Sequence, residues 1–482
     1  MSNVAKENNA KEGRIEWFRK TFGLPLAILV TIIVWYLPLP QGLQPVGLKC
    51  LALFSGIFVL YLTEAVSLPI TSLAIVPLAV LMGVASPKVA LDGFGSTSTY
   101  LLISAFILAI AMVKSRLAER LTYFILKMVG SSALGVSIGI TCANIVLAFL
   151  VPSTTARTAI LLPVCVGLIA IFKVGLKSRL AKGLLLTLTF TNATISAGIL
   201  TATVPNPITV EFITKAGGPE VSYMRWLVVG FPPALLMTAL TWWLCRRIFR
   251  PEVEEIPGGA TYVEEALKKL GPMKINEVRA IVLFSLAVIL WATGDWTKIN
   301  VTIAALAVSC LLFLPKIGFL TWEDANKGVS WQILFVAGGG ISLGEMMMKT
   351  GAAKWLAVSI LDAIGVTGMS LILVLIIVMM IIQYMHVLFV GTTAMTTAIM
   401  PVVIGMAQHM NVNPVIFALP AGMIMGGYPL LMFYNTLPNI LVYGTNELEV
   451  SDFPKVGFIL CTVAVILYAL CAATYWQWLG LF

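Results

Sequence analysis

Long apolar stretches dominate this 482-residue chain, and its charged residues lie mainly between them. A helix needs about 20 predominantly apolar residues to cross the hydrocarbon core of a bilayer. Candidate crossings lie near 24–38, 47–63, 66–85, 97–113, 184–214, 226–245, 280–293, 299–315, 331–348, 414–443 and 455–481. The pattern predicts an all-α polytopic membrane protein with about eleven transmembrane helices.

The composition agrees with this class. Hydrophobic residues make up 59% of the chain and charged residues only 11%, which is too apolar for a soluble globular protein. The seven cysteines form no CxxC pair, so we expect neither a disulfide framework nor a metal site. Motifs of metalloproteases and P-loop ATPases do not occur in the sequence. We therefore expect no cofactor and no enzymatic activity, and a protein driven by a gradient or by exchange.

The basic residues predict how the chain lies in the membrane. The formal net charge is +9, and the basic residues gather before the first apolar run, after the fourth, and in the polar loop 247–279. Under the positive-inside rule, these clusters predict a cytoplasmic N-terminus. With eleven crossings, the C-terminus of this multi-pass cell-membrane protein would be extracytoplasmic. Topology accounts for the charge, so no nucleic-acid partner is expected.

Two further apolar stretches, 133–172 and 366–408, do not fit single crossings. Basic sequence flanks the first stretch on both sides, so it starts and ends on one side of the membrane. It is either two full spans or a re-entrant hairpin of half-helices. The interruption at Pro152–Thr155 favours the hairpin, because proline and hydroxyl side chains break a membrane helix most cheaply where the freed backbone faces a cavity.

Three pairs of motifs recur in the same order, which indicates an internal repeat. "VPSTTARTAILLP" (151–163) matches "FVGTTAMTTAIMP" (389–401), "TVPNPI" (203–208) matches "TLPNIL" (436–441), and "MVKSRLA" (112–118) matches "MMKTGAA" (347–353). The offsets are 238 (393 minus 155), 233 (436 minus 203) and 235 (349 minus 114). An odd number of crossings per unit makes the repeat inverted, which is how many secondary transporters build a substrate site from broken helices.

The repeat predicts how the chain is divided. We expect a cytoplasmic N-terminus (1–22), a first transmembrane helix (23–46) and a cytoplasmic linker with an interfacial helix (247–279). Repeat 1 would cover 47–246, with hairpin 133–172 and broken helix 184–214. Repeat 2 would cover 280–482, with hairpin 366–408 and broken helix 414–443.

The hairpin tips carry chemistry that suits an anion. The N-terminus of a helix has partial positive charge and unpaired N–H groups, and the tip hydroxyls add neutral donors. Arg157 adds a cation that can pair with a carboxylate, although it could instead cap carbonyls of its own hairpin. We interpret His386 as a hydrogen-bonded hairpin residue rather than a proton relay. The asparagines of the Pro-Asn motifs would satisfy backbone groups freed by the helix breaks.

"YLTEAVSLPITSL" (61–73), the hydroxyl-rich tips and the Thr-x-Pro-Asn breaks resemble the divalent anion/sodium symporter family over nearly the whole chain. The resemblance implies a homodimer in which a transport domain of hairpins and broken helices moves against a scaffold as an elevator. It also implies that substrate carboxylates sit between the tips, supported by the breaks. The expected substrate-binding residues are Ser153, Thr154, Thr155, Arg157, Thr203, Pro205, Asn206, Gly391, Thr392, Thr393, Thr436, Pro438 and Asn439.

The tips depart from the sodium-coupled pattern of this family. Sodium-coupled members usually carry Ser-Asn-Thr at both tips, whereas these tips read Ser153-Thr154-Thr155 and Gly391-Thr392-Thr393. Pro-Ser-Thr-Thr-Ala-Arg instead resembles the branch of citrate/succinate and 2-oxoglutarate/malate antiporters, which often has a histidine where Met395 stands. The leading expectation is therefore obligate exchange of C4/C5 dicarboxylates (malate, 2-oxoglutarate, succinate) without sodium. A sodium-coupled di/tricarboxylate symporter is the alternative, and an anion channel is a remote one.

Overall fold

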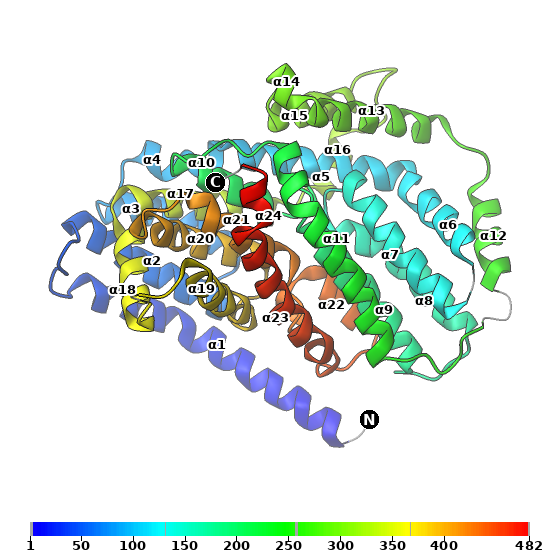
Figure 1. Cartoon of the computed structure of the whole chain (residues 1–482), viewed down its shortest axis with the longest axis horizontal. Helices are drawn as coiled ribbons and strands as arrows, with labels where there is room; N and C mark the ends of the chain where they lie inside the picture. The colour runs from blue at the N-terminus through cyan, green and yellow to red at the C-terminus, as the bar shows by residue number, and fades with distance from the viewer. Residues whose placement is uncertain (1–2, 131, 256–258, 367, 481–482) are drawn as a thin grey trace.

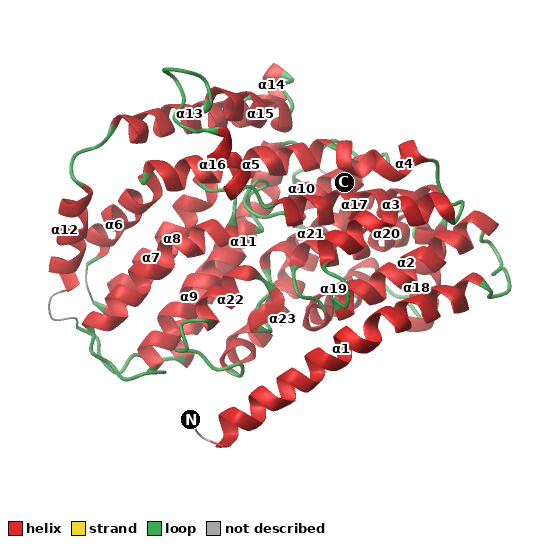
Figure 2. Cartoon of the chain, turned by 180° about the vertical axis from the view of Figure 1, so that it is seen from behind, coloured by secondary structure: helices red, strands yellow, loops and turns green. Residues whose placement is uncertain are grey.

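A computed structural model describes residues 3–130, 132–255, 259–366 and 368–480. These residues form a bundle of helices and contain no β-strand, so the predicted all-α fold is confirmed (Figures 1 and 2). Residues 1–2 of the expected N-terminal segment and 481–482 of the expected second repeat lie outside the described residues. The helix α1 (Asn3–Trp35) packs against α2 along one edge of the molecule.

The two predicted repeats appear as two series of helices. The first series contains α2 (Pro45–Thr63), α3 (Leu68–Leu81), α4 (Pro87–Leu91), η1 (Asp92–Gly95), α5 (Thr97–Ser115), α6 (Leu117–Val129), α7 (Ala133–Leu150), α8 (Thr154–Ile171), α9 (Arg179–Ser196), α10 (Pro205–Lys215) and α11 (Tyr223–Ile248). After α12 (Gly259–Leu270), the second series contains α13 (Ile275–Ala292), α14 (Gly294–Thr297), α15 (Val301–Leu311), α16 (Trp322–Gly328), α17 (Trp331–Lys349), α18 (Ala352–Ile364), α19 (Leu371–Met385), η2 (His386–Leu388), α20 (Thr392–His409), α21 (Pro414–Gly427), η3 (Phe433–Asn435), α22 (Leu437–Tyr443), α23 (Asp452–Ala473) and α24 (Tyr475–Trp478).

Corresponding helices of the two series begin at nearly constant spacing. The starts of α7 and α19 (133 and 371) and of α8 and α20 (154 and 392) are both 238 residues apart. Each hairpin also begins in the same way, because Ser132 and Ser370 accept hydrogen bonds from backbone N–H groups three residues later. The repeat found in the motifs therefore extends to the helix boundaries.

The segments expected to form hairpins and broken helices each contain two main helices. Hairpin 1 is α7 and α8, hairpin 2 is α19 with η2 and α20, and the broken helices are α9 with α10 and α21 with α22. Among the described residues, eight helical stretches are long and apolar enough to cross a membrane, and α3, α15 and α21 are shorter apolar helices. With 18 residues each, α7 and α8 are about 27 Å long, close to the roughly 30 Å of a bilayer core. The re-entrant interpretation therefore remains a prediction.

The first helix and the linker differ in detail from the expected boundaries. The helix α1 runs without interruption through most of the expected polar segment 1–22 and ends at Trp35, whereas the expected span extends to residue 46. Pro38 and Pro40 follow the helix end, and proline disfavours helical geometry in the residue before it. The expected linker helix is α12, which packs against α6 at one end of the bundle (Figure 2).

Three consecutive glycines bring α17 into close contact with its neighbours. A Cβ atom added to Gly339 would lie 2.3 Å from the carbonyl oxygen of Ser72 on α3, and one added to Gly340 would lie 2.3 Å from Cβ of Thr397 on α20. Small residues at helix interfaces allow backbones in membranes to approach closely. The helix α17 thus joins the second hairpin to the helices of the first repeat.

We expect Gly339→Leu to destabilise the protein, because its Cβ alone would overlap the backbone of α3. Overpacking of this kind costs about 1–3 kcal/mol. Gly175→Leu is the matched control, since a Cβ at Gly175 meets nothing within 4 Å. The measurement is the thermal unfolding midpoint of each variant in detergent, and equal midpoints for the two variants would contradict the packing assigned to α17.

Candidate functional site

The tip of hairpin 1 is the capped start of α8. Ser153 is the N-cap residue, and its Oγ accepts a hydrogen bond of 3.3 Å from the backbone N–H of Ala156. The preceding Val151 and Pro152 are buried, whereas Ser153, Thr154 and Thr155 are partly exposed. Tip 1 therefore presents three hydroxyl groups at the positive end of a helix dipole.

The tip of hairpin 2 has an open helix start. Gly391 precedes α20 with φ 125°, a backbone conformation that favours glycine, and no side chain caps the helix. Gly391, Thr392 and Thr393 are partly exposed. The first-turn N–H groups of α20 thus have no side-chain cap, which is the usual chemistry of an anion-binding helix N-terminus.

One asparagine donates hydrogen bonds to the free backbone carbonyls at each helix break, as the sequence predicts. The side-chain amides of Asn206 and Asn439 are fully buried, and each donates to the carbonyls ten and seven residues earlier. These bonds measure 2.9 and 2.9 Å to Ser196 and Ile199, and 2.8 and 3.1 Å to Pro429 and Met432. Pro205 and Pro438 stand in the first turns of α10 and α22, where proline fits a helix.

The structure brings the two breaks together. Gly426 near the end of α21 lies against the first break, because a Cβ there would be 3.0 to 3.2 Å from atoms of Asn206, Thr203 and Pro205. From α9, Thr189 Oγ1 donates a 2.7 Å hydrogen bond to Asn439 Oδ1. The helix α8 packs against α22, and α20 packs against α10. The second helix of each hairpin therefore contacts the broken helix of the other repeat.

A cavity of about 570 Å³ reaches tip 1 but not tip 2. Its lining includes Ser153 and Thr155 from the tip, Leu437 beside Thr436, and residues of α5 and α16. Gly391, Thr392 and Thr393 do not line this cavity. Its volume suits a small-molecule ligand.

Each charged side chain on the cavity wall forms an ion pair. Lys114 and Asp324 form an ion pair of 2.5 Å, and Lys327 pairs with Glu323 at 2.6 Å. Hydrogen bonds from Lys114 and Thr321 lower the pKa of the Asp324 carboxyl to about 2, so this group is ionised at neutral pH. Because each lysine is balanced by a carboxylate, the wall itself gives an anion little net attraction.

Arg157 lies behind tip 1 and is fully buried. Its Nη2 donates to Ser196 Oγ at 2.5 Å and to the carbonyl of Ala202 at 3.1 Å, which ties α8 to the first helix break. Nε and Nη1 are buried without a hydrogen-bond partner, and no described carboxylate lies within 4.0 Å of the guanidinium. Arg157 does not line the cavity. Arg157 therefore bonds a carbonyl of the first helix break rather than one of its own hairpin, and no described acidic group balances its charge.

Other buried asparagines, which the sequence analysis did not select, connect these elements. Asn192 on α9 donates to the carbonyl and hydroxyl oxygens of Thr154 and Thr158 at 2.8 Å each, and its Oδ1 has no partner. Asn435 in the second break donates to the carbonyls of His386 and Phe389 at 2.6 and 3.1 Å. Their position within apolar stretches of the sequence could have indicated this role, since a buried amide requires hydrogen-bond partners.

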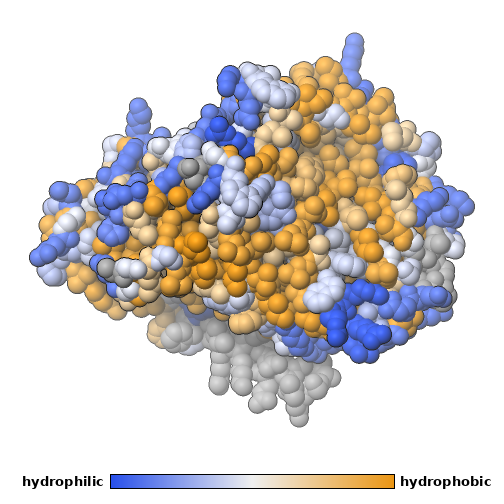
Figure 3. Space-filling model, in the orientation of Figure 1, coloured by the Kyte–Doolittle hydropathy of each residue, from blue (hydrophilic) through white to orange (hydrophobic). Residues whose placement is uncertain are grey.

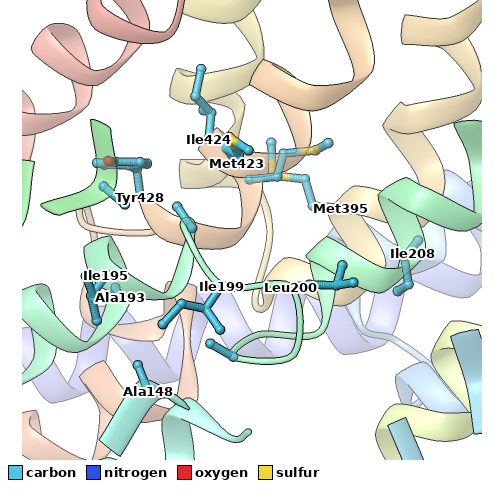
Figure 4. Packing of buried hydrophobic residues seen from close by; sticks show 14 of the residues in the cluster. Ala148, Ala193, Ile195, Ile199, Leu200, Ile208, Met395, Met423, Ile424 and Tyr428 are labelled. Atoms are coloured by element: carbon cyan, nitrogen blue, oxygen red, sulfur yellow. The ribbon is translucent and has the colours of Figure 1, made fainter. Parts of the chain in front are cut away.

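His386 and Met395 occupy closed surroundings. The ring nitrogens of His386 lie 3.0 Å from the Gln383 carbonyl and 3.3 Å from the Met425 carbonyl, in agreement with a hydrogen-bonded hairpin residue. Met395 corresponds to Arg157 in the repeat, and it belongs to the same buried hydrophobic cluster as Met423 (Figure 4). Repeat 2 therefore has an apolar side chain where repeat 1 has a cation.

Many secondary membrane transporters share an internal repeat with broken helices, as seen in these two series. The family model described as "Sodium:sulfate symporter transmembrane region" matches residues 19–482. The chain belongs to this family, the divalent anion/sodium symporters, so the predicted family is confirmed. The prediction that the protein is a transporter and not an enzyme is confirmed as well.

Several curated relatives cover nearly the whole chain. A membrane protein of Cupriavidus necator is 30% identical, over 95% of this chain and 93% of the relative. The putative malate transporter YflS of Bacillus subtilis is 26% identical, with 96% and 97% coverage. The sodium-dependent dicarboxylate transporter SdcS of Staphylococcus saprophyticus is 27% identical, with 96% and 92% coverage. The YdaH transporter structure of Alcanivorax borkumensis, which is 11% identical, has a similar fold, with a TM-score of 0.51 over 81% of this chain and 88% of that chain.

We expect Asn206→Ala and Asn439→Ala each to destabilise the protein, because two buried carbonyls lose their donors. An unsatisfied buried polar group costs about 1–3 kcal/mol. Asn326→Ala is the control, since Asn326 is exposed on α16. Thermal midpoints in detergent measure the effect, and a midpoint unchanged in both break variants would show that the amides do not hold the breaks.

Proposed function

We propose that this protein is a secondary transporter of C4/C5 dicarboxylates such as malate, 2-oxoglutarate and succinate, and that it works as an obligate exchanger without sodium coupling. The relatives named as malate and dicarboxylate transporters support the substrate class. Two helix N-termini with partly exposed hydroxyl groups support a doubly negative ligand, because each can stabilise one carboxylate. The expected binding residues at the tips and breaks form the proposed site.

The observation that carries the proposal is the unbalanced charge of Arg157 directly behind a tip that lines a cavity. Arg157 follows Ser153 by four residues, which is about 6 Å along a helix axis. If the guanidinium lies about 6 Å from a bound anion, it contributes about 2–3 kcal/mol to binding at an effective dielectric constant of 20. Arg157 would therefore attract the substrate through its field, while its hydrogen bonds hold the break.

The same charge gives a physical reason for exchange. An empty site with an unpaired buried cation is costly to move through a low-dielectric barrier, whereas a bound dicarboxylate compensates that charge. Only loaded carriers would then move readily between the two sides of the membrane. The tips themselves contain no asparagine, and a threonine hydroxyl is a poorer ligand for a small cation than an amide oxygen.

We further propose that the hairpins and broken helices move together as an elevator against the other helices, in a homodimer with a cytoplasmic N-terminus. The different packing of the two hairpins supports a moving unit. The helix α20 packs closely against α17 and α18, whereas the start of α8 borders the cavity beside α5. This arrangement is expected of one state of a carrier that opens alternately at tip 1 and tip 2.

Sodium-coupled uptake is the second candidate, and one observation favours it. Oδ1 of Asn192 and Oδ1 of Asn206 are buried beside the first break without hydrogen-bond partners. Amide oxygens are suitable ligands for a hard cation. A relative named as a sodium-dependent dicarboxylate transporter points the same way.

Uptake of labelled malate into proteoliposomes separates these functions. We expect uptake only when unlabelled dicarboxylate is present inside, with the same rate in sodium and in potassium. Uptake into empty vesicles driven by a sodium gradient would replace exchange by symport. An electrical conductance without counter-substrate would instead indicate an anion channel.

Arg157→Asn tests the origin of exchange. We expect the affinity for malate to fall by about 30- to 150-fold, as the loss of about 2–3 kcal/mol implies, and empty vesicles to gain some net uptake. Arg157→Lys keeps the charge and should retain strict exchange. Both variants are compared by thermal midpoint, so that a folding defect is recognised. Unchanged affinity and strict exchange in a well-folded Arg157→Asn protein would contradict the account.

A further inference from the structure

The end of α11 forms a small pocket outside the proposed transport site. The pocket encloses about 380 Å³ and is lined by Trp242, Trp243, Arg246, Arg247, Arg250 and Glu254. We call it the arginine–tryptophan pocket. Three guanidinium groups face one carboxylate there, so the pocket has a net positive charge.

The cations of this pocket are only partly balanced. Arg246 Nη2 donates to both carboxylate oxygens of Glu254, at 3.0 and 2.8 Å, and its buried Nη1 has no hydrogen-bond partner. Arg247 and Arg250 are exposed, and neither forms an ion pair with a described carboxylate. The exposed guanidinium groups of Arg247 and Arg250 are thus available to one ligand oxyanion.

The helix α7 holds two walls of the pocket in place. Trp242 Nε1 donates to Ser137 Oγ at 3.0 Å, and the backbone N–H of Ala133 donates to the Glu254 carbonyl at 2.8 Å. The positions of the indole ring and of the Glu254 loop are therefore fixed before a ligand binds. Preorganised groups lose less conformational freedom on binding.

The pocket continues into an apolar stripe on the outer face of α11. Leu236 and Trp243 are 59% and 52% exposed, and with Leu240 and Arg247 they recur every three or four residues, on one side of the helix. Figure 3 shows a broad hydrophobic face bordered by hydrophilic residues, at the edge where Figure 1 places the end of α11. A tryptophan between apolar and basic residues is typical of the membrane–water interface.

We propose that the arginine–tryptophan pocket binds an anionic phospholipid. Arg247 and Arg250 hold the phosphate, and an acyl chain lies along Leu236, Leu240 and Trp243. Guanidinium groups match phosphate oxygens in geometry, and basic pockets at helix ends bind acidic headgroups. The adjoining apolar stripe favours a lipid over free phosphate, because only a lipid contacts both parts. This proposal rests on membrane embedding and not on the transported substrate.

The test measures the thermal midpoint of delipidated protein in detergent after addition of phosphatidylglycerol, phosphatidylcholine or inorganic phosphate at equal concentration. We expect phosphatidylglycerol to raise the midpoint by several degrees, and the other two additions to leave it unchanged. In Arg247→Gln/Arg250→Gln, the phosphatidylglycerol concentration needed for half of the shift should rise at least tenfold. Lys88→Gln/Lys354→Gln removes two charges from exposed positions elsewhere and should respond like the wild type.

Each other result overturns the proposal. An equal shift of the midpoint with phosphatidylcholine would indicate a general effect of lipid. An equal shift with inorganic phosphate would indicate a site that binds an oxyanion without contacting an acyl chain. An undiminished response of the double arginine variant places the lipid elsewhere. Native mass spectrometry provides an independent measure, since the wild type should retain more bound phosphatidylglycerol than the double variant.

Discussion

Two buried asparagine side chains make the central arrangement possible. A helix that breaks inside a membrane frees backbone carbonyls, and each unsatisfied group in hydrocarbon costs several kcal/mol. Asn206 and Asn439 supply the missing donors with the same ten- and seven-residue spacing in both repeats. Gly426, which has no side chain, then allows the end of α21 to contact the first break. Each hairpin then packs against the opposite repeat.

The repeats share a backbone plan but differ in how the hairpin is tied to the break. In repeat 1 a buried guanidinium bonds Ser196 and Ala202, whereas in repeat 2 the amide of Asn435 bonds His386 and Phe389. Met395 stands in the apolar core at the position that corresponds to Arg157. A single copy of the repeat therefore supplies the fixed charge. In the proposed function, this difference makes the site selective for anions while the two tips keep similar hydroxyl chemistry.

Much of the fold could be predicted because particular residue types mark the ends of its helices. Proline, asparagine and threonine mark the breaks between helices, and the serine and glycine before α8 and α20 mark the tips, so the helix boundaries in these segments could be predicted within a few residues. The direction of the Arg157 side chain could not be predicted, because a helix that is apolar on all sides carries no periodicity to show which face meets which neighbour. The links made by Asn192 and Asn435 depend on contacts between distant segments. The early end of α1 was missed because the apolar run continues past Trp35 into a proline-containing loop.

The central claim is that a charge of the protein, rather than a bound cation, holds the substrate at tip 1. Calorimetric titration of malate into purified protein in sodium-free buffer tests it most directly, with choline and sodium chloride compared at equal ionic strength. The account predicts binding in choline, with an affinity that sodium does not change. Binding that appears only in sodium would contradict it. The Oδ1 atoms of Asn192 and Asn206, which have no hydrogen-bond partner, would then be the candidate ligands of the cation.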